Sequence, residues 1–229
     1  MKILLIILFI SIIAGFFLYE KRRGDELAQF ARQNGFSLEK GQQRLPKALG
    51  GAGFYLFTQG APYAMNIMQG SKGSYQITLL EYFYDAAFGD EGDRFLPNSD
   101  DDGQINKHAQ LVAWVQSETL NLPEFDLSST NSPIRSAAAR AGYFPVSFDN
   151  ASDFNQIFKL AGRDAQRLRS MFSEQLRQML LQHPEWIIES RGNQLLFYQP
   201  DQRTDSQAIS GWLSEIQQFL DLAIVSAVE

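Results

Sequence analysis

The chain has 229 residues, a net charge of −6 at pH 7, two histidines and no cysteine. This length suffices for one large domain or two small ones with a sizeable core. The acidic balance argues against nucleic-acid binding because phosphates repel it, and the absence of cysteine excludes disulfides and cysteine nucleophiles.

The chain begins with an apolar run, residues 3–19, which lies between Lys2 and the charged residues 20–23. At the helical rise this run covers about 26 Å, near the lower limit for a hydrocarbon core of ~30 Å. It predicts a transmembrane anchor with a basic flank over residues 1–23, which contacts the lipid bilayer through residues 3–19. The alternative is a cleaved secretory signal, but a cut after Ala14 or Gly15 places a bulky isoleucine at the −3 position.

Basic residues near the run indicate its orientation, since cytoplasmic flanks are enriched in lysine and arginine. Lys2 precedes the run, whereas Lys21, Arg22 and Arg23 follow it. The sequence therefore predicts a single-pass protein of the inner membrane with an uncleaved signal anchor. Its large domain is expected in the cytoplasm, and a periplasmic domain is the alternative.

Residues 25–119 change from a helical pattern to strands. Residues 25–34 predict a short helix with Leu27, Phe30 and Ala31 on one face and Gly35 after its end. Alternating apolar residues in the later segments are typical of an antiparallel meander with one buried face. The expected strands are residues 36–39, 54–58, 63–68, 74–84 and 107–117.

The remaining chain adds helices and a hairpin. Residues 134–141 and 163–181 predict helices, and His183-Pro184 ends the second. Residues 186–190 and 194–199 predict a hairpin, and a helix follows from residue 205 almost to the end. Residues 122–125 predict a short edge piece, and residues 144–148 and 154–160 predict strands.

These elements predict an α+β fold, in which a transmembrane helix precedes an antiparallel sheet packed with helices. The soluble α+β domain is expected over residues 24–229. Subdomains over 24–130 and 131–229 are an alternative division that nothing in the composition requires.

Several short motifs in the C-terminal third occur together in one order: Phe154-Asn155-x-x-Phe158, His183-Pro184-Glu185-Trp186, Arg191-Gly192 and residues 195–198. With the short apolar leader, this arrangement resembles a group of bacterial membrane-anchored proteins with no defined activity. The resemblance implies a bacterial, membrane-associated protein. It implies no catalytic residue, because none is known in that group.

The acidic segment 85–106 is the strongest candidate for a cation site. Its residues from Asn98 to Ile105 match the opening of a calcium loop, with oxygens at positions 1, 3 and 5 and Gly103 for the turn. The twelfth position is Ala109, where a bidentate glutamate is required, and strands flank the segment where helices are expected. A solvated hairpin loop explains the same residues, so no metal ligand is assigned.

Other matches to functional patterns have ordinary structural explanations. Residues 37–40 fit S-x-x-K without its partner motifs, and residues 50–53 are rich in glycine but lead into a predicted strand, where a phosphate cradle needs a helix. His183 precedes Pro184 at a helix end, where it can satisfy terminal carbonyls. The sequence therefore assigns no catalytic, cofactor-binding or metal residue and no cofactor.

The function expected from the sequence is a membrane-tethered, non-enzymatic interaction or sensing module for an undefined ligand or protein partner. The alternative is an enzyme or a weak cation-binding protein that uses residues 85–106. Carboxylates that converge on a histidine, arginine or tyrosine in a concave pocket favour the enzyme. A third hypothesis is an assembly subunit that associates through the last helix.

Overall fold

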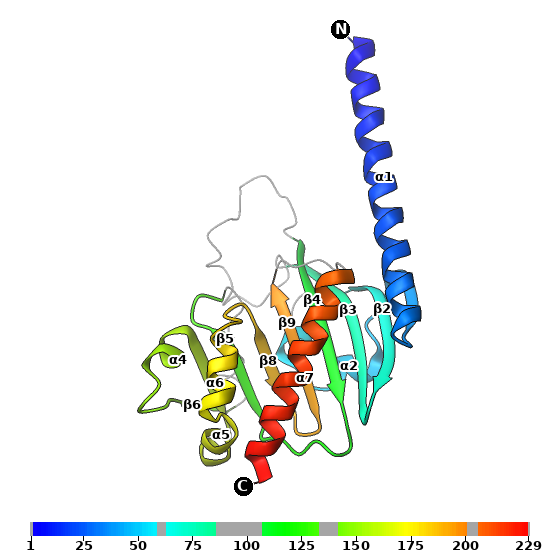
Figure 1. Cartoon of the computed structure of the whole chain (residues 1–229). Helices are drawn as coiled ribbons and strands as arrows, with labels where there is room; N and C mark the ends of the chain where they lie inside the picture. The colour runs from blue at the N-terminus through cyan, green and yellow to red at the C-terminus, as the bar shows by residue number, and fades with distance from the viewer. Residues whose placement is uncertain (1, 59–62, 86–106, 133–141, 201–205, 229) are drawn as a thin grey trace.

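A computed structural model of the chain describes residues 2–58, 63–85, 107–132, 142–200 and 206–228. These residues build an antiparallel sheet that helices cover (Figure 1). The strands of the described residues are β1 (Ser37–Gln43), β2 (Tyr63–Lys72), β3 (Tyr75–Asp85), β4 (Lys107–Gln116), β5 (Phe125–Ser129), β6 (Phe144–Val146), β7 (Phe158–Gly162), β8 (Ile187–Ser190) and β9 (Gln194–Pro200). The helices are α1 (Lys2–Gln33), α2 (Lys47–Gly50), η1 (Tyr55–Thr58, a 3-10 helix), α4 (Ser152–Ile157), α5 (Ala165–Met171), α6 (Glu174–Leu180) and α7 (Ser206–Val228).

Within the described residues the strand order is β1-β2-β3-β4-β9-β8-β5-β7-β6, and each adjacent pair is antiparallel. The β8–β9 hairpin therefore lies between the meander β1–β4 and the strands β5, β7 and β6. The predicted hairpin over residues 186–199 is confirmed. The sheet contains strands from both sides of residue 130.

The two faces of the sheet bury different side chains because residues alternate along each strand. One face packs against α1, α5, α6 and α7 around residues such as Leu79, Ala113 and Phe197. The opposite face carries Leu80, Val112 and Tyr198, which pack against α2 and η1. Figure 1 shows α7 lying across the first face.

The predicted transmembrane helix is contradicted. In the part of the chain that the structure describes, no helix is long and apolar enough to cross a membrane. The helix α1 does form, but its apolar run over residues 3–19 covers only about 26 Å, and the same helix continues without a break into the charged residues 20–23. This finding also overturns the single-pass and signal-anchor assignments and the inner-membrane location with a cytoplasmic or periplasmic domain. The expected bilayer contact through residues 3–19 rested on the same helix.

The C-terminal part of α1 packs on the sheet as the predicted helix over residues 25–34 requires. Leu27, Phe30 and Ala31 are buried, and Gly35 follows with φ +72°. Farther up the helix, Arg23 forms an ion pair with the buried Glu81 of β3. Glu81 also accepts a hydrogen bond of 3.0 Å from the Asn66 side chain, and Asn66 itself has a φ of +52°. This buried pair fixes the position of α1 against the sheet.

Four predicted elements are wrong. Residues 54–58 form the 3-10 helix η1, and residues 152–157 form α4, so only the end of the predicted strand 154–160 becomes β7. The predicted helix 163–181 divides into α5 and α6 at Phe172-Ser173, where the Ser173 side chain caps α6. The predicted edge piece over residues 122–125 leads into β5, an internal strand. The predicted helix 134–141 lies outside the described residues.

Substitutions at two glycines test the packing of the sheet against α5. A Cβ at Gly162 of β7 would lie 2.5 Å from both the Glu124 carbonyl oxygen and the Leu168 side chain, whereas a Cβ at Gly211 of α7 meets nothing within 4 Å. We expect Gly162→Ala to lower the free energy of unfolding by about 1–3 kcal/mol through overpacking. Gly211→Ala, the matched control in an exposed helix position, should raise it by about 0.5–1 kcal/mol. Urea unfolding measures both changes, and a neutral Gly162→Ala would contradict the close packing.

Candidate functional site

Two buried carboxylates and one guanidinium meet on the face of the sheet that η1 covers. Asp126 of β5 lies directly opposite Glu189 of β8 in the strand register. Arg191 follows β8 in the turn of the β8–β9 hairpin, so its side chain reaches back to both acids. Glu189 is 1% exposed and Asp126 is 4% exposed. We call Asp126, Glu189, Arg191 and Tyr198 the buried charge cluster.

Glu189 accepts four hydrogen bonds, two at each carboxylate oxygen. Oε2 accepts from the Tyr55 backbone N–H at 2.6 Å and from Arg191 Nη2 at 2.9 Å. Oε1 accepts from the Leu56 backbone N–H and from the Tyr198 hydroxyl, each at 3.1 Å. Every contact is a donor facing the carboxylate, so Glu189 attaches residues 55 and 56 to the sheet.

Arg191 is held by charge, by backbone carbonyls and by aromatic rings. Its Nη1 donates to Asp126 Oδ1 at 2.9 Å and to the Ser190 carbonyl at 2.8 Å, and its Nε donates to the Gly53 carbonyl at 3.2 Å. The guanidinium also lies 5.5 Å from the ring centres of Phe54 and Tyr143. Arginine suits this position because its planar fork can serve two acids at once.

The cluster contains one negative charge in excess when both acids are ionised. Burial raises the pKa of Glu189 to about 7, and the neighbouring Asp126 adds to this. Burial likewise raises the pKa of Asp126, although the charge of Arg191 opposes it. The second oxygen of Asp126, Oδ2, is buried and has no hydrogen-bond partner among the described residues. The cluster therefore favours the uptake of one proton.

Residues 53–58, which we call the strap, cover the cluster and the aromatic side chains beside it. Phe54 and Leu56 of the strap are fully buried. The Tyr82 hydroxyl donates to the Leu56 carbonyl at 3.2 Å, and the Phe57 ring meets the Tyr82 ring edge-on at 5.0 Å. Three of the four residues before Phe54 are glycines, and Gly53 has a φ of +78°, which favours glycine. The strap is thus held at its centre and begins at a flexible sequence.

At one end of the sheet, the edge strand β6 carries an exposed aromatic side chain. Phe144 is 68% exposed, which is unusual for a large apolar residue within the described part of the chain. Arg163 lies 5.6 Å from the ring centre of the neighbouring Tyr143 and 3.3 Å from Glu124 Oε2. We call the two exposed residues of this edge strand, Phe144 and Pro145, the β6-edge patch.

The residues that the sequence singled out lie elsewhere. The acidic residues 86–106 lie outside the described residues, so the cation hypothesis for them stays a prediction. Among the residues that the structure does describe, no group of three histidine or acidic side chains could hold a metal ion. Residues 37–40 lie in the edge strand β1, and residues 50–53 join α2 to the strap.

His183 is part of a structural contact. Its backbone N–H donates to the Leu180 carbonyl at 2.9 Å, and its ring stacks on Trp186 at 4.6 Å. Its Nδ1 lies 3.8 Å from Glu215 Oε2 of α7. The interpretation of His183 as a residue at the end of a helix is confirmed by the backbone hydrogen bond.

Comparison with known proteins identifies the fold but no family. No family model matches the chain, and no curated protein matches it. The fold resembles that of a transport factor. The crystal structure of the mycobacterial trehalose monomycolate transport factor A, TtfA, superposes with a TM-score of 0.58 over 87% of this chain and 93% of that one, at 14% sequence identity. At this identity the likeness concerns the fold alone.

Sequence reasoning missed the buried charge cluster. Its signal was Glu189, a charged residue among the apolar residues of a predicted hairpin strand, followed two positions later by Arg191. A lone acid in a strand usually points to solvent. Only the pairing of β8 with β5 and the position of η1 show that Glu189 points into the protein.

Proposed function

We propose that the chain is a non-enzymatic interaction module that binds a protein partner through the β6-edge patch. The observation that carries the proposal is Phe144, a 68% exposed aromatic side chain on the last strand of the sheet. Exposed aromatic residues are frequent anchors of protein interfaces, in which a few residues contribute most of the binding energy.

The geometry of β6 favours recognition through side chains over extension of the sheet. The strand has only three residues, and its central residue is Pro145, which has no backbone N–H to offer a further strand. A partner that docks there would therefore contact the Phe144 ring.

The buried charge cluster supports a binding role over a catalytic one. Carboxylates do converge on an arginine and a tyrosine, as the enzyme hypothesis requires, but Glu189 already accepts four hydrogen bonds from the protein itself. A general base needs access to its substrate. The fold neighbour is named as a transport factor, and that name agrees with a protein that acts by binding. The alternative of an enzyme or cation-binding protein that uses residues 85–106 stays a prediction.

Site-specific crosslinking in cells that express the protein tests the proposal. A photoreactive benzoylphenylalanine at position 144 should form an adduct with a discrete protein. The same group at Gln43, an exposed residue of β1 at the opposite end of the sheet, is the matched control. Identical adducts from both positions, or none from position 144, would contradict the proposal.

The purified partner then allows the contribution of Phe144 to be measured. We expect Phe144→Ala to weaken binding by about 30-fold or more, the effect of losing a central aromatic anchor. Its free energy of unfolding should stay within about 0.5 kcal/mol of the wild type, because the ring is exposed. Unchanged affinity would place the interface elsewhere.

A further inference from the structure

The contacts between the strap and Glu189 link one segment of backbone to one titratable pair. Glu189 holds the backbone N–H groups of Tyr55 and Leu56, and these bonds join positions 134 and 133 residues apart in sequence. On the other side, Arg191 holds the Gly53 carbonyl. Hence the beginning and centre of the strap are both attached to the buried charge cluster.

The strap covers an aromatic part of the sheet. Its Leu56 and Phe57 pack in the same cluster as Tyr82, Trp114 and Tyr198, from β3, β4 and β9. Movement of the strap about the glycines before Phe54 would uncover these side chains and admit water to Glu189. The described contacts therefore define a closed state, in which the acids are dry, and imply an open one, in which Glu189 is hydrated.

We propose that the strap is a proton-sensitive latch, which closes when the Asp126–Glu189 pair takes up one proton and opens when that proton is lost. Within the described residues, Asp126 and Glu189 share the guanidinium of Arg191, so the closed site holds one uncompensated negative charge unless a proton neutralises it. The proposal concerns the opposite face from Phe144 and does not depend on partner binding.

Among the groups that face Glu189, only the acid pair Asp126–Glu189 is expected to bind or lose a proton between pH 5 and pH 8. Asp126 faces it from β5, Arg191 from the hairpin turn and Tyr198 from β9, while η1 supplies backbone N–H groups. Tyr82 of β3 and Tyr143 before β6 lie in the same region. The charge of Glu124 adds to the raised pKa of Asp126, and Tyr84 adds to the raised pKa of Tyr198. Burial raises the pKa of Tyr82, Tyr143 and Tyr198 above the ordinary tyrosine value. Burial acts to lower the pKa of Arg191, but its two acids raise it above its ordinary value.

The sign of the effect follows from the two states. Burial is the main cause that raises the pKa of Glu189 in the closed state, and opening removes it. Loss of the two strap N–H groups acts in the other direction but is the smaller cause. The closed state therefore binds the proton more tightly than the open state, and raising the pH from about 5 to 8 favours opening.

Hydrogen exchange of the full chain at pH 5 and pH 8, corrected for the intrinsic pH dependence of exchange, tests the latch. Protection of residues 53–58 should fall by about 10- to 100-fold between pH 5 and pH 8, as expected if the pKa of Glu189 is about 7 in the closed state and returns to its ordinary value in the open one. Protection of residues 195–198 in the central strand β9 should change much less. Unchanged protection of the strap, or an equal loss in both segments, would overturn the latch.

Two variants identify the proton site. Glu189→Gln removes the ionisable group, and its amide NH2 cannot accept from the two donors that face one carboxylate oxygen. Its strap should therefore be less protected than that of the wild type at both pH values, and that protection should not depend on pH. Asp126→Asn removes the charge that helps to raise the pKa of Glu189. The strap of this variant should therefore stay more protected than that of the wild type at pH 8, and its protection should change less, or not at all, between pH 5 and pH 8. If Glu189→Gln loses as much protection between pH 5 and pH 8 as the wild type does, the titration belongs to another group and the proposal is refuted. If Glu189→Gln does not fold, a pH response in Asp126→Asn equal to that of the wild type has the same consequence.

Discussion

Replacement of Arg191 by methionine is expected to lower the free energy of unfolding by about 3–5 kcal/mol at pH 7. The substitution leaves Asp126 and Glu189 buried without their shared cation, and it removes the hydrogen bond to the Gly53 carbonyl. Methionine keeps much of the side-chain volume, so lost charge compensation dominates the effect. Denaturant unfolding measured by circular dichroism gives the change.

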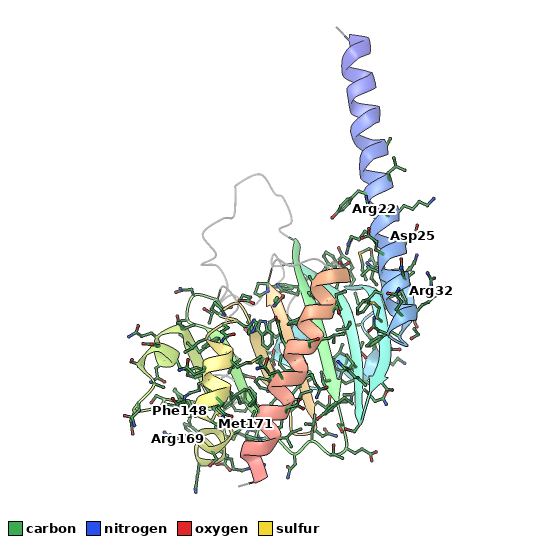
Figure 2. The ribbon with its side chains drawn as sticks, viewed as in Figure 1. Arg22, Asp25, Arg32, Phe148, Arg169 and Met171 are labelled. Carbon is green, nitrogen blue, oxygen red and sulfur yellow. The ribbon has the colours of Figure 1, made fainter. Side chains whose placement is uncertain are left out.

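Arg169→Met is the matched control for Arg191→Met. Arg169 lies on α5, on the side of the molecule away from α1 (Figure 2). Its exposed side chain donates a hydrogen bond of 3.3 Å to the Ser147 carbonyl. Its replacement should change the free energy of unfolding by less than about 1 kcal/mol. Equal effects of the two substitutions would show that the buried charge cluster does not stabilise the fold.

Phe172→Ala should also lower the free energy of unfolding by about 3–5 kcal/mol, the usual cost of truncating a large buried ring to alanine. Phe172 is fully buried between α5 and α6, and its ring meets the Phe125 ring edge-on at 5.1 Å. Phe125 begins β5, so the cavity would separate the helices from the strand that carries Asp126.

The exposed Phe144 provides the comparison for Phe172→Ala. Phe144→Ala removes the same atoms from a side chain that is 68% exposed, so its effect on unfolding should be within about 0.5 kcal/mol. Thermal and urea unfolding of both variants show whether the loss of stability comes from the burial of the ring or from the loss of a phenylalanine as such. A small effect at Phe172 would contradict the packing of α5 and α6 on the sheet.

Local sequence patterns predicted those elements whose stabilising contacts are close in the chain. The hairpin of β8 and β9 has alternating apolar residues around a turn with Gly192, whose φ is +73°. The helix over residues 25–34 places Leu27 and Phe30 on one buried face. In both cases the spacing of apolar residues, together with one glycine, is enough to predict the element and where it ends.

The misassigned elements depend on single polar contacts that periodicity does not reveal. Ser173 accepts a hydrogen bond from the Leu176 N–H and begins α6, although the apolar spacing continues across the break. Asn155 binds both backbone groups of Phe148, which fixes α4 beside the chain before it, where a strand was predicted. Such contacts compete with the tendency of aromatic residues to form strands.

The buried charge cluster could not be predicted, because its partners are distant in sequence. Asp126 and Arg191 are 65 residues apart, and Tyr55 is 134 residues from Glu189. No local pattern shows that an acid at position 189 will accept backbone N–H groups from residues 55 and 56. The conformation of η1 itself is stabilised by that acid, which explains why residues 54–58 were predicted as a strand.

A carboxyl ¹³C NMR titration of the full chain, with Glu189 assigned by comparison with Glu189→Gln, tests the central claim most directly. We expect a midpoint at a pH of about 7 for the Glu189 carboxyl group. The amide resonances of Tyr55 and Leu56 should move with the same midpoint, because both N–H groups donate to that carboxylate. A midpoint near 4.5, or amide resonances that do not respond to it, would contradict a buried acid that holds the strap.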